Sequence, residues 1–214
     1  DLNGQTIAAE GEHKLQYALD MLLESLEIRR RLLHSPHPDI ATSLGNVGYL
    51  YTALGEFTTA RNYHEQALAM RELLYPEDEC PNGHPDLVIV LSNLGSLLRH
   101  QGNNVAARQY FERSLELNQR LYSEDQYPEG HPNLSTTLNN LGGVLESLNE
   151  YTAARHYYEQ ALAMRERIYS EVSYPNGHSQ VVTSLTNLGL LLYRHGDYTT
   201  AKGYLERALA MDER

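Results

Sequence analysis

The tetrapeptide His84-Pro85-Asp86-Leu87 indicates the fold, because close copies of it recur along the chain at a fixed interval. The copies begin at residues 37, 84, 131 and 178, so successive starts are 47 residues apart. Residues 84–130 and 131–177 are identical at 21 of 47 positions. An internal repeat of this length is typical of helical arrays, solenoids and propellers.

The repeat divides the chain into four units and a partial unit before them. The partial unit, 1–36, contains Ser25-Leu26-Glu27-Ile28, which matches Ser114-Leu115-Glu116-Leu117, and we expect it to be mainly a second helix. The full units span residues 37–83, 84–130, 131–177 and 178–214, and the last ends within its second helix. We expect one continuous domain. Because the chain begins at Asp1 rather than Met, we interpret it as a piece of a longer protein.

Each unit has the hydrophobic pattern of two helices, which are called helix A and helix B below. In the second full unit Leu87, Leu91, Leu94 and Leu98 recur at helical spacing, and Gly102-Asn103-Asn104 then interrupts the pattern. A second stripe follows, made of Ala107, Tyr110, Phe111, Ser114 and Leu115. No strand pattern occurs, so the sequence predicts an all-α fold in which units must stack to bury their stripes.

A glycine lies inside helix A of every full unit, two residues after an asparagine. The glycines are Gly48, Gly95, Gly142 and Gly189. A glycine inside a helix costs about 1 kcal/mol relative to alanine, so four at one register need a structural reason. We expect them to permit a close approach between helices, with Gly48 facing Ala60 of helix B.

These residues resemble the tetratricopeptide repeat, and within it the kinesin-light-chain-like subclass. The resemblance rests on Val47-Gly48 followed by Gly55-Glu56-Phe57-Thr58-Thr59-Ala60, and on Leu188-Gly189 followed by Gly196-Asp197-Tyr198-Thr199-Thr200-Ala201. Asn149 and Asn104 depart from the pattern. The resemblance implies an α-solenoid that winds as a right-handed superhelix. It also implies non-catalytic binding of a protein or extended peptide segment in the groove lined by helix A.

In this family the asparagine of helix A clamps the backbone of a bound peptide. The alternative is that each asparagine bonds a neighbouring helix and braces the array. Arg99, His100 and Arg194 would make part of the groove basic, unless they are ordinary solvated or ion-paired groups. The predicted groove residues are Asn46, Asn93, Asn140, Asn187, Tyr49, Ser92, Ser96, Arg99, His100, Asn139, Tyr193 and Arg194.

Other functional classes find little support in the sequence. A net charge of −11 argues against nucleic-acid binding, and no apolar run is long enough for a membrane helix. The histidines that open the units are interpreted as helix-start residues rather than metal ligands, and Cys80 as an apolar loop residue in a reducing, cytoplasmic setting. No catalytic motif or cofactor site is predicted. Only Lys14 and Lys202 are lysines, an arginine bias that favours a bacterial source.

Two rival functions remain open at this point. The array could be a regulatory sensor that controls an attached protease or NTPase domain, or a purely architectural spacer. We also expect the fragment to associate end to end through apolar residues at its two ends. We expect the first end face to expose parts of Leu15, Leu19, Leu22 and Leu26, and the last to include some of Tyr198, Ala201, Leu205, Ala208 and Leu209.

Overall fold

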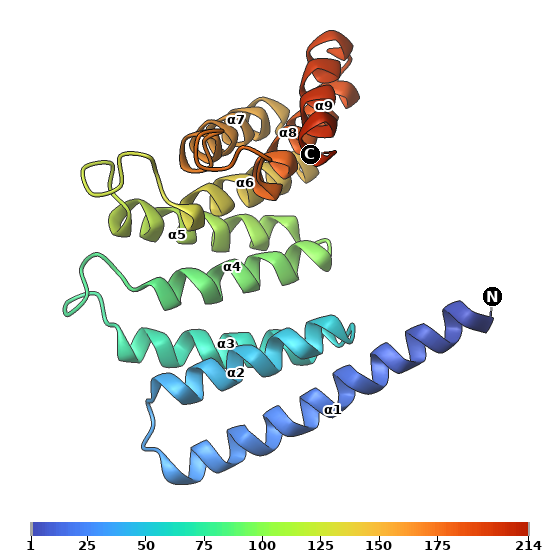
Figure 1. Ribbon diagram of the computed structural model, residues 1–214. Coiled ribbons are helices and arrows are strands. Elements are labelled where there is room, and N and C mark those ends of the chain that lie inside the picture. Colours follow the sequence, from blue (N-terminus) through green and yellow to red (C-terminus); the bar gives the residue numbers. More distant parts are fainter. Residues whose placement is uncertain (1, 214) are drawn as a thin grey trace. The chain divides into compact units, whose positions relative to one another are not determined.

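The computed structural model describes residues 2–213, and its side chains from residue 13 to residue 213. All regular structure within these residues is helical, as predicted (Figure 1). The helices are α1 (Leu2–Leu32), α2 (Pro38–Ala53), α3 (Phe57–Leu74), α4 (Pro85–His100), α5 (Asn104–Leu121), α6 (Pro132–Ser147), α7 (Tyr151–Ile168), α8 (Ser179–Arg194) and α9 (Tyr198–Asp212). The all-α helical-repeat fold is therefore confirmed.

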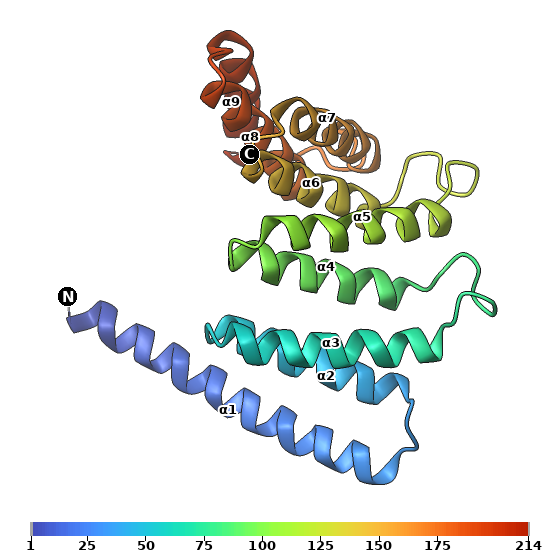
Figure 2. The same ribbon diagram turned by 180° about the vertical axis from the view of Figure 1, so that it is seen from behind.

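The helices fall into two compact units, Asp1–Gln101 with α1 to α4 and Gly102–Arg214 with α5 to α9. Within each compact unit every helix packs on the next helix along the chain. The two views of the ribbon show the successive antiparallel hairpins (Figures 1 and 2). Helix A corresponds to α2, α4, α6 and α8, and α1 takes the place of a first helix B. The single continuous domain and the right-handed superhelix stay predictions.

Each helix A begins at the histidine of the repeated tetrapeptide. The Nδ1 atom of this histidine accepts a hydrogen bond from the backbone N–H two residues later, at 3.1 Å in α2 and 3.2 Å in α4, α6 and α8. This bond satisfies one of the amide groups that a helix N-terminus leaves without a partner. The prediction that His37, His84, His131 and His178 are helix-start residues is confirmed.

A tyrosine at the end of the preceding helix B holds three of these histidines by ring stacking. The ring centroids of Tyr75 and His84 are 3.7 Å apart, those of Tyr122 and His131 3.5 Å, and those of Tyr169 and His178 3.6 Å. Each connector between units is therefore fixed by the same ring that caps the following helix.

We predict that His178→Ala lowers the free energy of unfolding by about 1–2 kcal/mol, because it removes both the cap and the ring stack. His178→Asn is the matched control, since asparagine retains a capping acceptor and loses only the stacked ring. Urea unfolding of both variants measures the difference. Equal stability of His178→Ala and the parent would contradict the capping role.

Three of the glycines inside helix A, namely Gly48, Gly142 and Gly189, lie under large side chains of helix B, as the sequence predicts in general but not in detail. A Cβ atom on Gly48 would lie 2.9 Å from the His64 ring, and one on Gly142 would lie 2.8 Å from the Tyr158 ring. A Cβ atom on Gly189 would meet Leu205 at 2.8 Å. The side chain closest to Gly48 belongs to His64, one turn after Ala60, and the carbonyl oxygen of Ala201, the equivalent of Ala60, would lie 3.4 Å from a Cβ atom on Gly189.

His64 is a polar residue at a register that holds Phe111, Tyr158 and Leu205 in the other units. Only 2% of its surface is exposed, and its Nδ1 atom has no hydrogen-bond partner among the described residues. Burial, together with the nearby Arg71 cation, lowers the pKa of His64 to about 4. The imidazole is therefore neutral in the folded chain at neutral pH.

We predict that acid destabilises the α2–α3 hairpin through His64. The pKa of His64 is about 4 in the folded chain, below its ordinary value of 6.5, so the unfolded chain binds the extra proton between these pH values. Stability is full above pH 6.5 and is lost as the pH falls toward 4. The loss between pH 7 and pH 5 should be about 2 kcal/mol.

The control variant for this test is His64→Leu, which places the residue of α9 at the same register. Urea unfolding at several pH values should show a smaller pH dependence for His64→Leu than for the parent. An identical pH dependence would show that other groups cause the acid sensitivity.

Buried arginines near the end of helix B fasten it to the next helix A. Arg165 of α7 is 3% exposed, and its Nη1 atom donates to the Gln180 carbonyl at 3.0 Å and to the Ser184 hydroxyl at 2.7 Å. Burial lowers the pKa of Arg165 to about 10, so the side chain remains a cation. Arg29 of α1 makes the same pair of bonds to Asp39 and Ser43. The role of this register was not predicted from the sequence.

The end faces differ from their predicted composition. Leu19 and Leu26 of α1 are 2% and 1% exposed, because α1 packs these residues against α2. In α9, Ala201 and Ala208 are also buried. Tyr198 and Leu209 are 62% and 58% exposed, as expected of an open end. End-to-end association stays a prediction. No helix of the described part of the chain has the length and apolar character needed to span a membrane.

Candidate functional site

The predicted groove residues all lie on helix A, and all of them are exposed or half-buried. In the first compact unit they lie on α2 and α4, and in the second on α6 and α8. The two helices contact each other within each unit. We call these faces the α2–α4 surface, with Asn46, Tyr49, Ser92, Asn93, Ser96, Arg99 and His100, and the α6–α8 surface, with Asn139, Asn140, Asn187, Tyr193 and Arg194.

The α2–α4 surface presents polar groups that remain available. Asn46 is exposed and Asn93 is half-buried, and neither side chain forms a hydrogen bond with another described residue. Tyr49, three residues after Asn46 in the sequence, is 66% exposed. Arg99 and His100 are exposed in the last turn of α4, and within the described residues neither forms an ion pair. This surface can donate and accept hydrogen bonds and can receive an anion.

The α6–α8 surface uses the same positions differently. Asn187 Nδ2 donates a hydrogen bond to Asn139 Oδ1 at 3.1 Å, which joins α8 to α6. Arg194 forms an ion pair with Glu146 of α6, and the Tyr158 hydroxyl donates to the other oxygen of the same carboxylate at 3.2 Å. Asn187 and Arg194 therefore brace neighbouring helices, which is the alternative role that the sequence left open.

Glu146 is the residue of this surface whose role sequence reasoning missed. It is equivalent to Thr52, Arg99 and Tyr193 of the other repeats, and it is the acidic residue among these four. Its side chain is 17% exposed and links three helices through Arg194 and Tyr158. The sequence does contain a signal for this pair. Glu146 lies 48 residues before Arg194, so the two residues occupy neighbouring positions in consecutive repeats.

The side chains of the two surfaces were also compared with the ligand sets of metal sites. Among the described residues, no three His, Cys, Asp or Glu side chains come together as a possible metal site. Cys80 is a half-buried free cysteine in the connector before α4. The chemistry that these surfaces offer is hydrogen bonding, ion pairing and contact with exposed tyrosine rings.

The comparison with known families agrees with the repeat. One tetratricopeptide-repeat model matches residues 7–72 and 86–167, and a second matches residues 181–214. The search of curated proteins found no match.

Solved structures with this fold include proteins from quite different sources. BtubC (BKLC) from P. vanneervenii matches with a TM-score of 0.77 and 23% identity, over 95% of this chain and 75% of that chain. A putative kinesin light chain from Podosopora anserina matches with a TM-score of 0.73 and 19% identity, over 94% and 89%. A Rap protein solved with Competence and Sporulation Factor matches with a TM-score of 0.69 and 18% identity, over 96% and 51%. At these identities the likeness is one of fold.

Proposed function

The chain belongs to the tetratricopeptide-repeat family, and we propose that it is a non-catalytic scaffold that binds a protein partner through an extended segment. The family is built from repeats that are generally non-catalytic and that serve protein interaction. The binding site in this proposal is the α2–α4 surface. The Rap protein of the same fold, solved with Competence and Sporulation Factor, supports a protein or peptide as the partner class.

The observation that carries the proposal is the contrast between equivalent asparagines. Asn187 is engaged with Asn139, whereas Asn46 and Asn93 have no partner among the described residues. An amide side chain offers both donors and an acceptor, which is what the peptide groups of an extended segment require. The sequence explains the difference between Asn187 and Asn93. The partner of Asn187 is Asn139 of the preceding helix A, and the equivalent residue before Asn93 is Gly45 of α2, which has no side chain to accept a hydrogen bond.

The basic end of the same surface indicates the chemistry of the segment. Arg99 and His100 adjoin the face that carries Asn93, on a chain with a net charge of −11. A free arginine can form two parallel hydrogen bonds to a carboxylate. We therefore infer that the bound segment carries a carboxylate, either an acidic side chain or a C-terminus, toward the end of α4.

We predict that the double variant Asn46→Ala and Asn93→Ala weakens binding of a peptide selected from a library of extended, acidic sequences. Each lost amide contact should cost about 1 kcal/mol of binding free energy, while the free energy of unfolding should change little. Calorimetric titration measures the first quantity and urea unfolding the second.

The matched control is Asn187→Ala, which removes an asparagine that already has a partner. This variant should lose stability and keep its affinity for the peptide. The proposal is wrong if the double variant binds as tightly as the parent, or if the selected peptide contacts neither α2 nor α4 when its site is mapped.

A further inference from the structure

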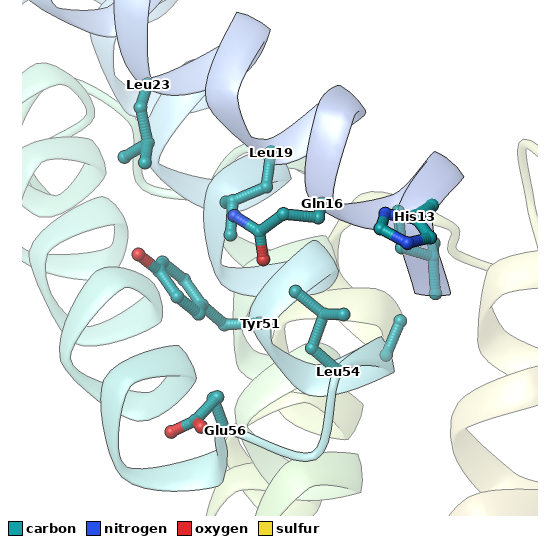
Figure 3. Close-up of a pocket in the computed structure, with 9 residues that line it drawn as sticks. His13, Gln16, Leu19, Leu23, Tyr51, Leu54 and Glu56 are labelled. Carbon is teal, nitrogen blue, oxygen red and sulfur yellow. The ribbon is translucent and has the colours of Figure 1, made fainter. Parts of the chain in front are cut away.

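A pocket of about 640 Å³ lies in the first compact unit, and none of the residues that line it belongs to the α2–α4 surface. One wall comes from α1, and the opposite wall from the end of α2 and the turn that leads to α3 (Figure 3). In the close-up, Gln16, Leu19 and Leu23 of α1 lie across from Tyr51, Leu54 and Glu56. His13, Leu15 and Ala53 complete the lining.

The positions of Leu19 and Leu23 can be compared with the equivalent positions of helix B in the other repeats. In α3, α5 and α7 an arginine pairs with a glutamate four residues later, as Arg61–Glu65, Arg108–Glu112 and Arg155–Glu159, each at 2.7 Å. The match of Leu26 with Leu115 aligns Leu19 with Arg108 and Leu23 with Glu112. In α1 the charged pair is therefore replaced by two leucines.

The arginine at this position also interacts with a carboxylate of the next repeat. Arg108 Nη1 forms an ion pair at 2.9 Å with Glu150, the N-cap residue of α7. Arg155 experiences the same attraction from Asp197, the N-cap residue of α9. Each of these carboxylates is thus complemented by a guanidinium from the preceding helix B.

Glu56 is the N-cap residue of α3 and the equivalent of Glu150. It keeps the carboxylate, but the residue that would supply its guanidinium is Leu19. Glu56 is exposed, makes no capping hydrogen bond, and has no ion pair with any described residue. The first compact unit therefore holds an acidic group without its cation, at a pocket lined by both polar and apolar side chains.

A second acidic group adds to the negative character of the pocket. Asp20 of α1 accepts a hydrogen bond from Gln16 at 3.0 Å. The pKa of Tyr51 is raised, first by burial, then by Tyr63, and further by the charges of Glu56 and Asp20. The Tyr51 ring stacks on Tyr63, with centroids 5.4 Å apart, so the ring is held in place.

We propose that this pocket binds an arginine side chain presented by a partner protein between apolar residues. Its guanidinium would pair with Glu56, as Arg108 pairs with Glu150. The aliphatic stem of an arginine packs on apolar surface such as the half-buried Leu23 and Leu54, and the cation is attracted to a tyrosine face. A net charge of −11 draws a basic segment toward the chain.

The test uses two acetylated, amidated pentapeptides, Ala-Leu-Arg-Leu-Ala and the same peptide with citrulline in place of arginine. Citrulline has nearly the same shape as arginine and no charge, so the comparison isolates the cation. We expect the arginine peptide to shift the methyl NMR signals of Leu19, Leu23 and Leu54. Its Kd should be about fivefold lower than that of the citrulline peptide, a ratio expected for one exposed ion pair.

Two variants of the chain complete the experiment. Glu56→Gln should raise the Kd of the arginine peptide about fivefold and leave that of the citrulline peptide unchanged. Glu150→Gln is the matched control at the same register, where the carboxylate already has Arg108 as its partner, and it should not change either Kd. Amide spectra of each variant show that it is folded.

Three results would overturn the proposal. Equal Kd values for the two peptides would exclude recognition of the cation, and signal changes confined to Asn46 and Asn93 would place the peptide on the α2–α4 surface. Self-association that is lost in Glu56→Gln would show that a second copy of the chain supplies the cation. None of these results contradicts the proposed peptide binding at the α2–α4 surface, which Asn46→Ala and Asn93→Ala test separately.

Discussion

The close contact between a glycine of helix A and a large side chain of helix B is the constraint on which each helical hairpin depends. A Cβ atom at Gly48, Gly142 or Gly189 would lie within 3.0 Å of the opposing side chain. At that spacing the two helices of a repeat can share one layer of apolar side chains, and the glycine itself recurs every 47 residues. The facing residue varies from His64 to Tyr158 to Leu205, so the register tolerates different shapes but not an added methyl group.

This constraint divides the surface of helix A between packing and recognition. The glycine and its neighbouring leucines face helix B or the adjacent unit and are buried, while the asparagine two residues earlier points away from them and stays accessible. The accessible face can change its chemistry without disturbing the packing. In α8 it braces α6 through Asn187, and in α2 and α4 its amides are free to meet a partner. The fold thus sets where binding can occur, and individual side chains decide whether it does.

Much of the fold could be predicted from the sequence, because the spacing of apolar residues and the residues that start or end helices are local signals. The helices, their start at a histidine and the burial of the glycine column follow from spacing alone. The close neighbour of Gly48 was missed, since side-chain reach over one helical turn is not visible in a pattern. The candidate site was predicted only in outline. Three features were not predicted, because they depend on contacts between residues of different repeats. They are the ion pair of Arg194 with Glu146, the hydrogen bonds of Arg165 to the next helix A, and the absence of an arginine partner for Glu56. A register comparison could have found Glu56, because Leu19 breaks a column of basic residues.

The central claim, that the buried glycine sets the helix pair, is tested most directly by comparing two glycines of the same helix. Gly48→Ala places a methyl group 2.9 Å from the His64 ring, whereas a Cβ atom on Gly45 has only Arg71 Nη1 within reach, at 4.0 Å. The account predicts that Gly48→Ala lowers the free energy of unfolding by about 1–3 kcal/mol. Gly45→Ala should raise it by about 0.5–1 kcal/mol, through helix propensity alone. Equal stabilisation of the chain by both substitutions, measured by urea unfolding, would contradict the account.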